Sequence, residues 1–297
     1  MTTFSLAQIP DQTGRTAVVT GATSGIGRVT AQALATRGAR VVLAVRDVDK
    51  GRAAAAAMPG DVVVRRLDLA DLASVRAFAA DLAEPVDLLV NNAGVMVPPL
   101  TRTADGFELQ LGTNHLGHFA LTNLLLPRVR GRVVTVSSSA HRFGAIDVDD
   151  LNWERRRYRP MAAYGQSKLA NLLFTAELQR RLAAAGSPVI AVAAHPGMAA
   201  THLLSERRGA GHLMHRVSVP FAQPAEDGAL PTLYAAVGDV PGDSYAGPSG
   251  FLEGRGAPTL VGRSARARDA AVARRLWDVS TSLTGVTFPA DLAGAAH

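Results

Sequence analysis

The chain contains no cysteine among its 297 residues. This absence excludes disulfide bonds, thiolate catalysis and thiolate metal sites, and it fits a reducing compartment. Lysine is nearly as scarce, because Lys50 and Lys168 are the only two and the other basic side chains are arginine. A planar guanidinium therefore serves almost everywhere in this chain, so a retained lysine indicates a task that needs a compact point charge.

Long apolar runs are also missing. No run reaches the ~18 residues that a membrane-spanning helix needs, and residues 1–14 lack the charged and apolar regions of a signal peptide. We therefore expect a cytoplasmic protein without a membrane span. A hydrophobic content of 47% still predicts a globular protein with a sizeable core.

The positive charge of the chain, +6 in total, is spread over several arginine clusters. The clusters at 155–159, 207–208 and 263–275 lie far apart in the sequence and match no nucleic-acid-binding module. We interpret them as solvated surface and expect no nucleic-acid partner. A second, more local interpretation is that some of them attract an anionic cofactor.

Apolar runs typical of buried strands alternate with helical segments along the chain. The expected strands are 16–20, 40–45, 62–67, 86–90, 132–136 and 189–194, with a further candidate near 250–252. The expected helices are one that ends near Gly38, then 72–82, 114–126, 169–182 and 225–237. Continuous Val and Leu runs joined by helices predict an α/β fold: one doubly wound parallel sheet of about seven strands with helices on both faces.

Two segments, 142–160 and 198–223, interrupt this alternation. Loops of that length within a compact domain are usually lids or binding loops, or else disordered. The segment 263–285 is typical of a basic amphipathic helix, with Ala271, Leu276 and Trp277 as candidate buried positions. Docking on the body of the protein and contact with a partner or membrane surface are both open for it.

A glycine-rich turn, Thr20-Gly-Ala-Thr-Ser-Gly-Ile-Gly27, follows the first expected strand. Its glycines permit a tight turn, close approach of the backbone to a pyrophosphate and close packing of the next helix. The helix N-terminus adds free N–H groups and a positive dipole end. This position between strand and helix favours nucleotide binding over an ordinary turn.

Tyr164 and Lys168 lie four residues apart, so a helix would place them on one face. Taken alone, this spacing occurs by chance in many chains. Together with the Gly-x3-Gly-x-Gly turn and Asn91-Asn-Ala-Gly94, however, it resembles the short-chain dehydrogenase/reductase family over residues 14–252. Further matching motifs are Asp68-Leu69, Asn114, Ser137-Ser138, and Pro196-Gly197 with Thr201.

Within that family the chain is most similar to the retinol-dehydrogenase-like branch. The similarity rests on Ala44-Val-Arg-Asp47, Thr113-Asn-His-Leu-Gly-His-Phe119, His195-Pro-Gly197 and the long gap before Tyr164. Light-driven protochlorophyllide reductases are similar too, but they are expected to use an active-site cysteine that this chain lacks. The resemblance implies a single Rossmann-type domain over 1–297, with its core at 14–252, a substrate loop at about 198–223 and a helical extension at 263–285.

The resemblance implies catalytic roles for Asn114, Ser138, Tyr164 and Lys168. Tyr164 would exchange the proton, Ser138 would hold the substrate oxygen, and Asn114 would anchor a water in a proton relay past Lys168. Lys168 would also bind the nicotinamide ribose and, with the oxidised cofactor, lower the pKa of Tyr164 from about 10 to about 7, which corresponds to roughly 4 kcal/mol. Ser138 could instead cap backbone or be mistaken for Ser137 or Ser139, and Asn114 could be a helix-start residue.

The implied cofactor-binding set spans the whole core. It comprises Gly21, Ser24, Gly25, Ile26, Gly27, Arg46, Asp68, Leu69, Asn92, Ala93, Gly94, Tyr164, Lys168, Pro196, Gly197 and Thr201. Asn92 could be only a turn residue, and Thr201 could cap the following segment. Arg46, at the end of the second strand, favours NADP(H) over NAD(H), because arginine can hold a phosphate bidentately. Asp47 would favour NAD(H) unless it caps the next helix.

The sequence thus predicts an NADP(H)-dependent oxidoreductase acting on a carbonyl or alcohol, with a regulatory protein that binds NADP(H) without turnover as the alternative. Apolar residues in both long loops suit a bulky apolar substrate, or else only pack the loops. They are Phe143, Trp153, Tyr158, Leu203, Leu204, Leu213 and Met214. His115, His118 and His195 form no recognisable metal site. A homo-oligomer is possible, and the oligomeric state stays open.

Overall fold

The computed structural model describes residues 4–198 and 223–293 of the chain. Its strands are β1 (Thr16–Thr20), β2 (Arg40–Val45), β3 (Val62–Arg66), β4 (Val86–Asn91), β5 (Val129–Val136), β6 (Ile190–Ala194), β7 (Tyr245–Pro248) and β8 (Pro258–Leu260). Its helices are α1 (Gly25–Thr36), α2 (Val48–Ala56), α3 (Leu72–Asp81), α4 (Leu109–Leu111), α5 (Gly117–Leu125), α6 (Pro160–Ala184), α8 (Ala225–Val237), α9 (Ala270–Thr284) and α10 (Ala290–Ala293).

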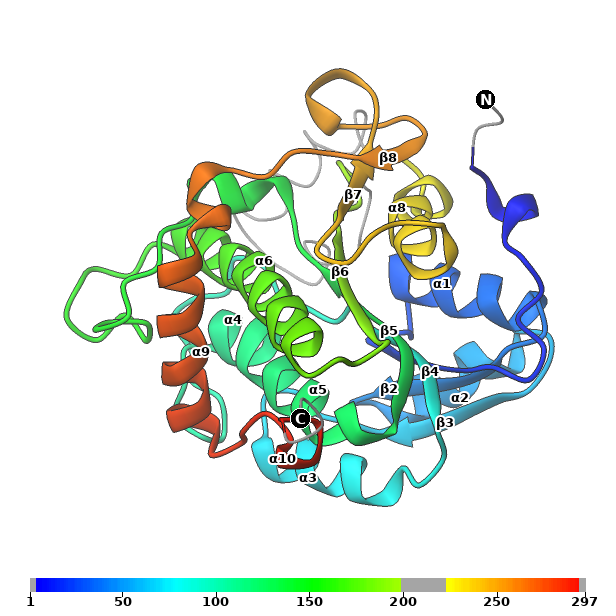
Figure 1. The fold of residues 1–297 in the computed structure, drawn as a ribbon, viewed down its shortest axis with the longest axis horizontal. Helices are drawn as coiled ribbons and strands as arrows, with labels where there is room; N and C mark the ends of the chain where they lie inside the picture. Colours follow the sequence, from blue (N-terminus) through cyan, green and yellow to red (C-terminus); the bar gives the residue numbers. More distant parts are fainter. Residues whose placement is uncertain (1–3, 199–222, 294–297) are drawn as a thin grey trace.

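These strands form one sheet in the order β3-β2-β1-β4-β5-β6-β7-β8 (Figure 1). Every neighbouring pair is parallel except β7 and β8, which run antiparallel. The predicted doubly wound sheet is confirmed, with eight strands where about seven were expected. The added strand follows β7 by a short connection, which suits antiparallel pairing, whereas a parallel pair needs a longer crossover.

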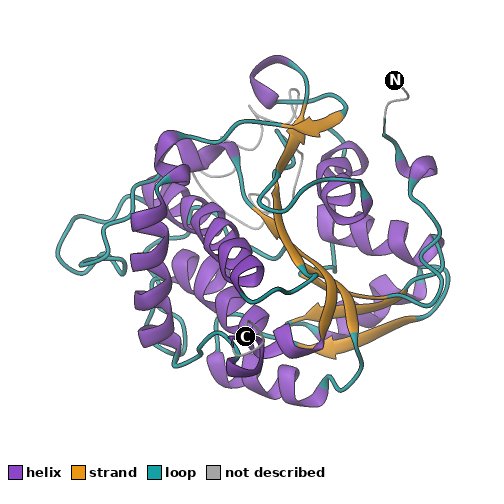
Figure 2. Cartoon of the chain, viewed as in Figure 1, coloured by secondary structure: helices purple, strands orange, loops and turns teal. Residues whose placement is uncertain are grey.

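Helices cover both faces of the sheet, with α1, α2 and α8 on one side and α3, α5 and α6 on the other (Figures 1 and 2). The alternation along β1 shows why both faces are apolar. Ala17 and Val19 pack into the cluster under α1 and α8, while Val18 packs into the cluster under α3 and α5. A strand buried on both faces has no solvent side, so its sequence is apolar throughout.

The helix that carries Tyr164 begins earlier than its sequence predicts. The expected helix covers 169–182, whereas α6 begins at Pro160 and ends at Ala184. Proline suits the first helical position because its missing N–H would have no partner there. Tyr164 and Lys168 therefore lie on one helix, which the expected range of 169–182 did not include.

The strand candidate near 250–252 is wrong. Phe251–Glu253 form a 3-10 turn, and Leu252 has a left-handed backbone with φ 51°. The apolar pair Phe251 and Leu252 is 88% and 80% exposed, so it does not belong to the core. The flanking strands β7 and β8 take its place in the sheet.

The C-terminal extension docks on the body through α9 (Figure 1). Asp269 caps the helix by accepting hydrogen bonds from two backbone N–H groups, and Gly285, in the left-handed conformation, ends it. Leu276 and Trp277 are buried as predicted, whereas Ala271 is exposed. Within the described parts of the chain, no helix is long and apolar enough to cross a membrane.

Candidate active site

The sheet order reverses between β1 and β4, and sheets of this kind bind ligands at the carboxyl ends of the strands at such a point. The glycine turn leaves β1 there and leads directly into α1 at Gly25. Ser24 occupies the N-cap position, and its side chain makes no capping hydrogen bond. The hydroxyl of Ser24 and the first N–H groups of α1, including that of Ile26, are thus free for an anionic ligand.

The glycine turn packs tightly against Asn91-Asn-Ala-Gly94. A Cβ at Gly21 would lie 2.8 Å from the Cα of Ala93, and one at Gly27 would lie 2.3 Å from Nδ2 of Asn92. Thr20 Oγ1 accepts hydrogen bonds from the backbone N–H groups of Asn92 and Ala93, both at 2.9 Å. Asn92 also donates from Nδ2 to the Thr20 carbonyl at 2.8 Å. Its side chain therefore stabilises the packed turns 20–27 and 91–94, which we call the cofactor cradle.

Tyr164 and Lys168 are both buried, with 7% and 4% of their surface exposed. Lys168 Nζ lies 5.7 Å from the centre of the Tyr164 ring and donates to the carbonyl of Val136, the last residue of β5, at 3.1 Å. Close packing at Gly165 sets this arrangement, because a Cβ there would lie 2.9 Å from the Ala140 carbonyl oxygen. The helix therefore lies directly against the turn that follows β5.

The two serines after β5 have different partners. Ser137 is buried and donates to the Lys168 carbonyl at 2.8 Å, so its hydroxyl is occupied within the fold. Ser138 accepts from the backbone N–H of Ala140 at 3.2 Å, and its side chain also partly opposes the rise of the Tyr164 pKa. Ser138 is thus both the backbone cap that the sequence allowed and the serine beside the tyrosine.

Tyr164 is not acidic in the protein alone. Burial raises the pKa of Tyr164 to about 12, and the hydrogen bond with Ser138 only partly opposes that rise. Burial likewise lowers the pKa of Lys168 to about 8. Lys168 is not among the causes that set the pKa of Tyr164 in the protein alone; burial and the contact with Ser138 set it.

Asn114 lies inside a helix, so the helix-start interpretation is wrong. Residues Gly112–Leu116 form a π-helical segment between α4 and α5. The fully buried Asn114 side chain accepts from Val95 N at 2.8 Å and donates to Val95 O at 3.0 Å and to Ser167 Oγ at 2.9 Å. Such π segments frequently occur at functional sites.

Gly94 brings the cofactor cradle next to the catalytic candidates. A Cβ at Gly94 would lie 3.2 Å from Asn114 Oδ1 and 3.5 Å from Lys168 Nζ. The structure therefore gathers Asn114, Ser138, Tyr164 and Lys168 around the end of the glycine cradle. Of the candidate cofactor residues on the far side, Arg46 follows β2 and Asp68 follows β3.

Asp47 caps α2 by accepting from the backbone N–H of Lys50 at 3.0 Å, and it also pairs with the Lys50 ammonium at 3.6 Å. The backbone hydrogen bond at Lys50 is the main cause that lowers the pKa of Asp47. The adjacent Arg46 is exposed and has no hydrogen bond or ion pair to another described residue. The acid at this strand end is therefore engaged, while the guanidinium is free.

The remaining cofactor candidates lie at the carboxyl ends of β3 and β6. Asp68 is half-buried and accepts from Ala70 N at 3.0 Å, and Leu69 packs under Gly117, where a Cβ would lie 2.4 Å from the Leu69 carbonyl oxygen. Gly197 has φ 65° and follows Pro196 directly after β6. Thr201 and the loop residues Leu203, Leu204, Leu213 and Met214 lie outside the described residues.

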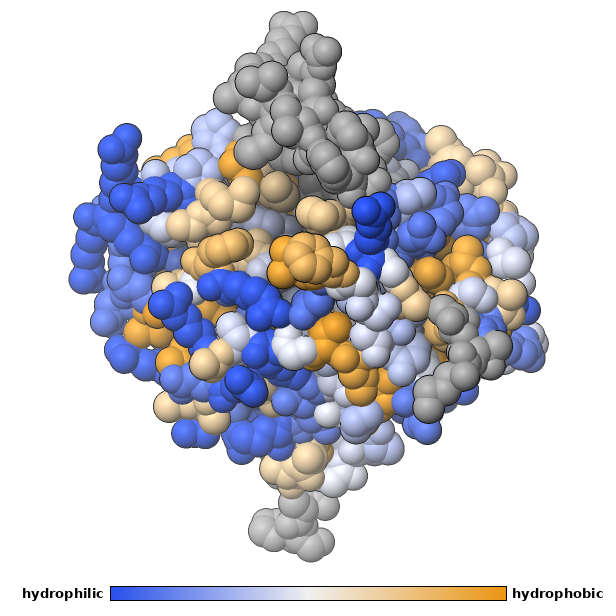
Figure 3. Space-filling view, turned by 90° about the horizontal axis from the view of Figure 1, so that it is seen from above, coloured by the Kyte–Doolittle hydropathy of each residue, from blue (hydrophilic) through white to orange (hydrophobic). Residues whose placement is uncertain are grey.

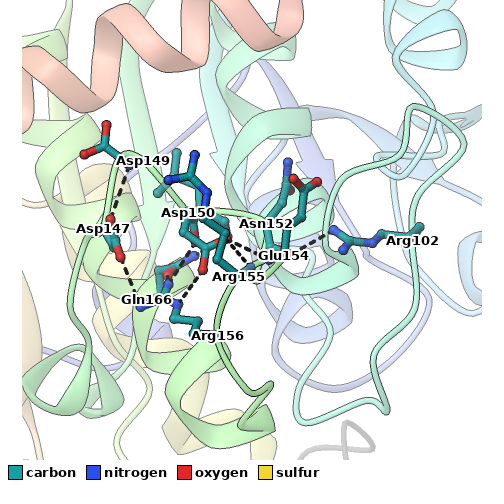
Figure 4. Close-up of polar contacts among 10 residues, drawn as sticks. Arg102, Asp147, Asp149, Asp150, Asn152, Glu154, Arg155, Arg156 and Gln166 are labelled. Atoms are coloured by element: carbon teal, nitrogen blue, oxygen red, sulfur yellow. Dashed lines mark hydrogen bonds and ion pairs between the residues drawn. The ribbon is translucent and has the colours of Figure 1, made fainter.

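The insertion before Tyr164 folds back onto α6 (Figure 4). Arg156 lies over the Trp153 ring at 3.9 Å, donates to the Asp150 carbonyl and, at 2.7 Å, to the Gln166 side chain. Gln166 returns a hydrogen bond to the Leu151 carbonyl at 2.8 Å. Trp153 is thus a packing residue, and Gln166, between Tyr164 and Lys168 in sequence, is a position that the sequence analysis missed.

The three histidines that the sequence analysis considered as metal ligands each contact polar groups of the protein itself. His115 Nε2 lies 2.9 Å from Ser280 Oγ of α9, and His195 Nε2 lies 3.1 Å from a Glu253 carboxylate oxygen. His118 contacts Thr20 and the Asn114 carbonyl. Among residues 4–198 and 223–293, no group of three or more His, Asp or Glu side chains could hold a metal ion.

The family model for short chain dehydrogenases matches residues 15–210. The chain therefore belongs to the short-chain dehydrogenase/reductase family and, with its curated relatives, to the retinol-dehydrogenase-like branch. It is an oxidoreductase that acts on CH–OH and C=O groups with NAD(P). The predicted family and enzyme class are confirmed.

Particular relatives span nearly the whole chain. Human retinol dehydrogenase 13 is 44% identical, over 96% of this chain and 88% of that protein. An uncharacterized protein from Mycobacterium paratuberculosis shares 55% identity, with a TM-score of 0.87 over 97% of this chain and 100% of that one. A structure described as an NAD(P)-dependent gluconate 5-dehydrogenase from Beutenbergia cavernae, with bound NADP, is 29% identical, with a TM-score of 0.58 over 77% and 91% of the two chains.

Proposed function

We propose that this protein is an NADP(H)-dependent carbonyl reductase or alcohol dehydrogenase in which Tyr164 is the proton donor. The observation that carries the proposal is the buried Tyr164 beside Ser138 and Lys168, with Asn114 and Lys168 both facing Gly94 of the cradle. The relatives named as dehydrogenases support turnover and give no support to the regulatory alternative.

The chain's own residues supply a proton and hydrogen bonds to the substrate oxygen. A bound nicotinamide would supply or accept the hydride. Ser138 and Tyr164 would hold the carbonyl oxygen, and Tyr164 would pass its phenol proton to that oxygen as negative charge develops. A Tyr164 pKa of about 12 keeps the phenol protonated at neutral pH, which prepares the free protein for reduction.

Lys168 and the glycine cradle fit the cofactor. Lysine has three N–H donors, and only one of those on Lys168 is used by Val136. The other two would bind the hydroxyls of the nicotinamide ribose. The close approach at Gly21 and Gly27 leaves room for backbone and phosphate but not for a side chain.

Arg46 supports NADP(H) over NAD(H). A free guanidinium at the end of β2 can pair bidentately with a 2′-phosphate, while the carboxylate of the next residue, Asp47, caps α2. The same position in a chain that prefers NAD(H) carries a free acid, which accepts from the ribose hydroxyls. The bound NADP of the Beutenbergia cavernae structure is compatible with this preference.

Replacement Arg46→Ala is expected to raise KM for NADPH by about 10- to 100-fold, since a charge-assisted pair contributes roughly 1.5–3 kcal/mol. KM for NADH should change by less than about threefold, because NADH lacks the 2′-phosphate. Steady-state kinetics with each cofactor measures both values. Arg52→Ala is the matched control, since Arg52 lies on the following helix α2 and is paired with Asp49 at 3.0 Å. Equal losses with both cofactors, or a wild-type preference for NADH, would contradict the assignment.

The rate constant kcat/KM for NADPH is expected to fall above pH of about 8. This parameter reports groups of the free enzyme, and burial lowers the pKa of Lys168 to about 8. Lys168 therefore loses its positive charge as the pH rises through that value, and attraction for the anionic cofactor weakens. Tyr164 stays protonated throughout this range. A profile that is flat from pH 6 to 10 would show that Lys168 does not control cofactor capture.

A bulky apolar substrate is supported by exposed side chains near the site. Phe143 and Met198 are 76% and 55% exposed, and Phe251 and Leu252 lie on the neighbouring turn. The Arg142–Glu253 pair at 2.9 Å and the Met198–Gly254 hydrogen bond at 2.8 Å connect these segments. On the face seen from above, hydrophobic side chains form patches among hydrophilic ones (Figure 3). Retinoids, steroids, aromatic ketones and polyketide-like carbonyls fit this chemistry.

A panel of such carbonyls and alcohols, followed through NADPH absorbance, tests the proposed function. We expect turnover with apolar carbonyls and little with small polar ones. Absence of turnover across the panel, with NADPH binding intact, would favour the regulatory alternative instead.

A further inference from the structure

His118 is a buried imidazole that contacts both the cofactor cradle and Asn114. It lies one helical turn after Asn114, at the start of α5, and is 1% exposed. Its Nδ1 is 3.0 Å from the Asn114 carbonyl oxygen, and its Nε2 is 2.9 Å from Thr20 Oγ1. Thr20 is the last residue of β1, directly before the glycine turn.

These contacts allow only one arrangement of protons. The Asn114 carbonyl can only accept, so Nδ1 of His118 carries the hydrogen. In a neutral ring Nε2 then accepts, and the Thr20 hydroxyl donates to it at 2.9 Å in preference to the Val90 carbonyl at 3.4 Å. The Thr20 oxygen is left to accept from Asn92 N and Ala93 N, both at 2.9 Å, as observed.

The ring stays neutral at physiological pH. Burial and, to a lesser extent, the nearby Lys168 charge lower the pKa of His118 to about 4, although the bond to the Asn114 carbonyl opposes both. An uncharged, fully bonded imidazole suits a structural link and not a proton donor at pH 7.

We propose that His118 is a positioning residue that fixes the main chain of Asn114 relative to the cofactor cradle. The inference rests on the proposed function, because Asn114 is part of the proposed site and the family resemblance implies a proton relay through it. Val95 and Ser167 already hold the Asn114 side chain. His118 adds a hydrogen bond to the peptide carbonyl of Asn114. This carbonyl lies in the π segment, in which Gly117 N donates to Gly112 O, five residues earlier.

Thr20 connects His118 to the cofactor cradle by hydrogen bonds. Thr20 binds the Asn92–Ala93 backbone on one side and His118 on the other. A displacement of Asn114 relative to the glycine turn therefore requires a break in this chain of hydrogen bonds. The position of Asn114 is therefore fixed relative to the glycine turn.

Two variants of His118 separate this role from simple packing. His118→Leu removes the donor to Asn114, and we expect kcat to fall about tenfold, as for loss of one buried hydrogen bond. KM for NADPH should change by less than about threefold. His118→Asn should restore kcat to within about threefold of wild type. The chain provides the precedent, because Asn123 Nδ2 on the same helix donates to the carbonyl of Phe119, four residues earlier, at 2.9 Å.

His115→Leu is the matched control, because it removes another buried imidazole, from the π segment directly before α5. His115 contacts Ser280 and makes no hydrogen bond to the Asn114 carbonyl. Thermal unfolding of all three variants is measured beside kcat. We expect His115→Leu to lower the melting temperature but to leave kcat within about threefold of wild type. A similar loss of kcat in His115→Leu, or wild-type kcat in folded His118→Leu, would overturn the inference.

A spectroscopic measurement tests the link without turnover. Long-range ¹H–¹⁵N correlation spectra of the wild-type protein should show His118 as the neutral Nδ1–H tautomer from pH 5 to 8, with the signal assigned by its loss in His118→Asn. The Nε2–H tautomer, or protonation near pH 6.5, would overturn the inference. If the tautomer is as expected but no carbonyl is reduced, the proposed function fails while the His118 hydrogen bonds stand.

Discussion

Replacement Tyr164→Phe is expected to lower kcat for carbonyl reduction by about 10²- to 10⁴-fold, the range over which a positioned proton donor contributes to catalysis. Phenylalanine keeps the ring that fills this buried position and removes only the hydroxyl that bonds Ser138. The loss should therefore fall on the chemical step. NADPH binding, followed by fluorescence titration, should stay within about threefold of wild type.

Tyr234→Phe provides the control for this change. Tyr234 lies on α8, where its ring packs on Phe4 with centres 5.3 Å apart, away from the catalytic helix. The activity of the Tyr234→Phe variant should match that of the wild type. If Tyr164→Phe kept wild-type kcat while folded, the proton would have to come from another group, and the proposed mechanism would be wrong.

The second large effect is expected on stability, from Trp277→Ala. Trp277 is 3% exposed and lies between two helices of the body. Its ring stacks on Phe174 with centres 5.7 Å apart and meets Phe119 edge-on at 4.9 Å. Truncation of such a buried aromatic residue leaves a cavity and typically costs about 3–5 kcal/mol in the free energy of unfolding.

Urea unfolding of Trp277→Ala measures this loss, and Arg274→Ala on the exposed side of α9 is its control. The arginine variant should change the free energy of unfolding by less than about 0.5 kcal/mol. A similarly small change for Trp277→Ala would mean that α9 contributes little to the stability of the body. Activity of the tryptophan variant at low temperature separates loss of folding from loss of chemistry.

Strand positions were the most predictable part of this fold. The runs at 16–20 and 40–45 match β1 and β2 at both ends, because strands buried on two faces must be apolar throughout. The glycine turn was equally visible, since only glycine fits where a Cβ would meet Ala93 or Asn92. Position in the sheet and backbone crowding leave direct marks on the sequence.

Features that depend on long-range partners were not visible. The start of α6 follows the arginines of the insertion, and Arg156 is positioned by contacts with Asp150, Trp153 and Gln166. The apolar pair Phe251 and Leu252 looked like a strand but forms an exposed turn. Periodicity reports burial on average, and it cannot identify a turn held by remote partners.

The candidate site shows the same division. The family resemblance singled out Tyr164, Lys168 and Asn114, and the structure places Asn114 and Lys168 beside Gly94, with Tyr164 next to Lys168. The high pKa of Tyr164 could not be foreseen, because it comes from burial. The alternative roles of Asp47 were left open by the sequence, and the N-cap geometry of α2 shows that it caps the helix.

The opposite exposures of the two lysines have a practical consequence for chemical labelling. The Lys50 side chain is 69% exposed on α2, whereas Lys168 is 4% exposed inside the site. Amine-reactive dyes or surface linkers should therefore attach at Lys50 in the folded state and leave Lys168 unmodified. A reporter group could thus be placed at one side-chain amine beside the proposed 2′-phosphate site, while α6, which carries Lys168, stays unmodified.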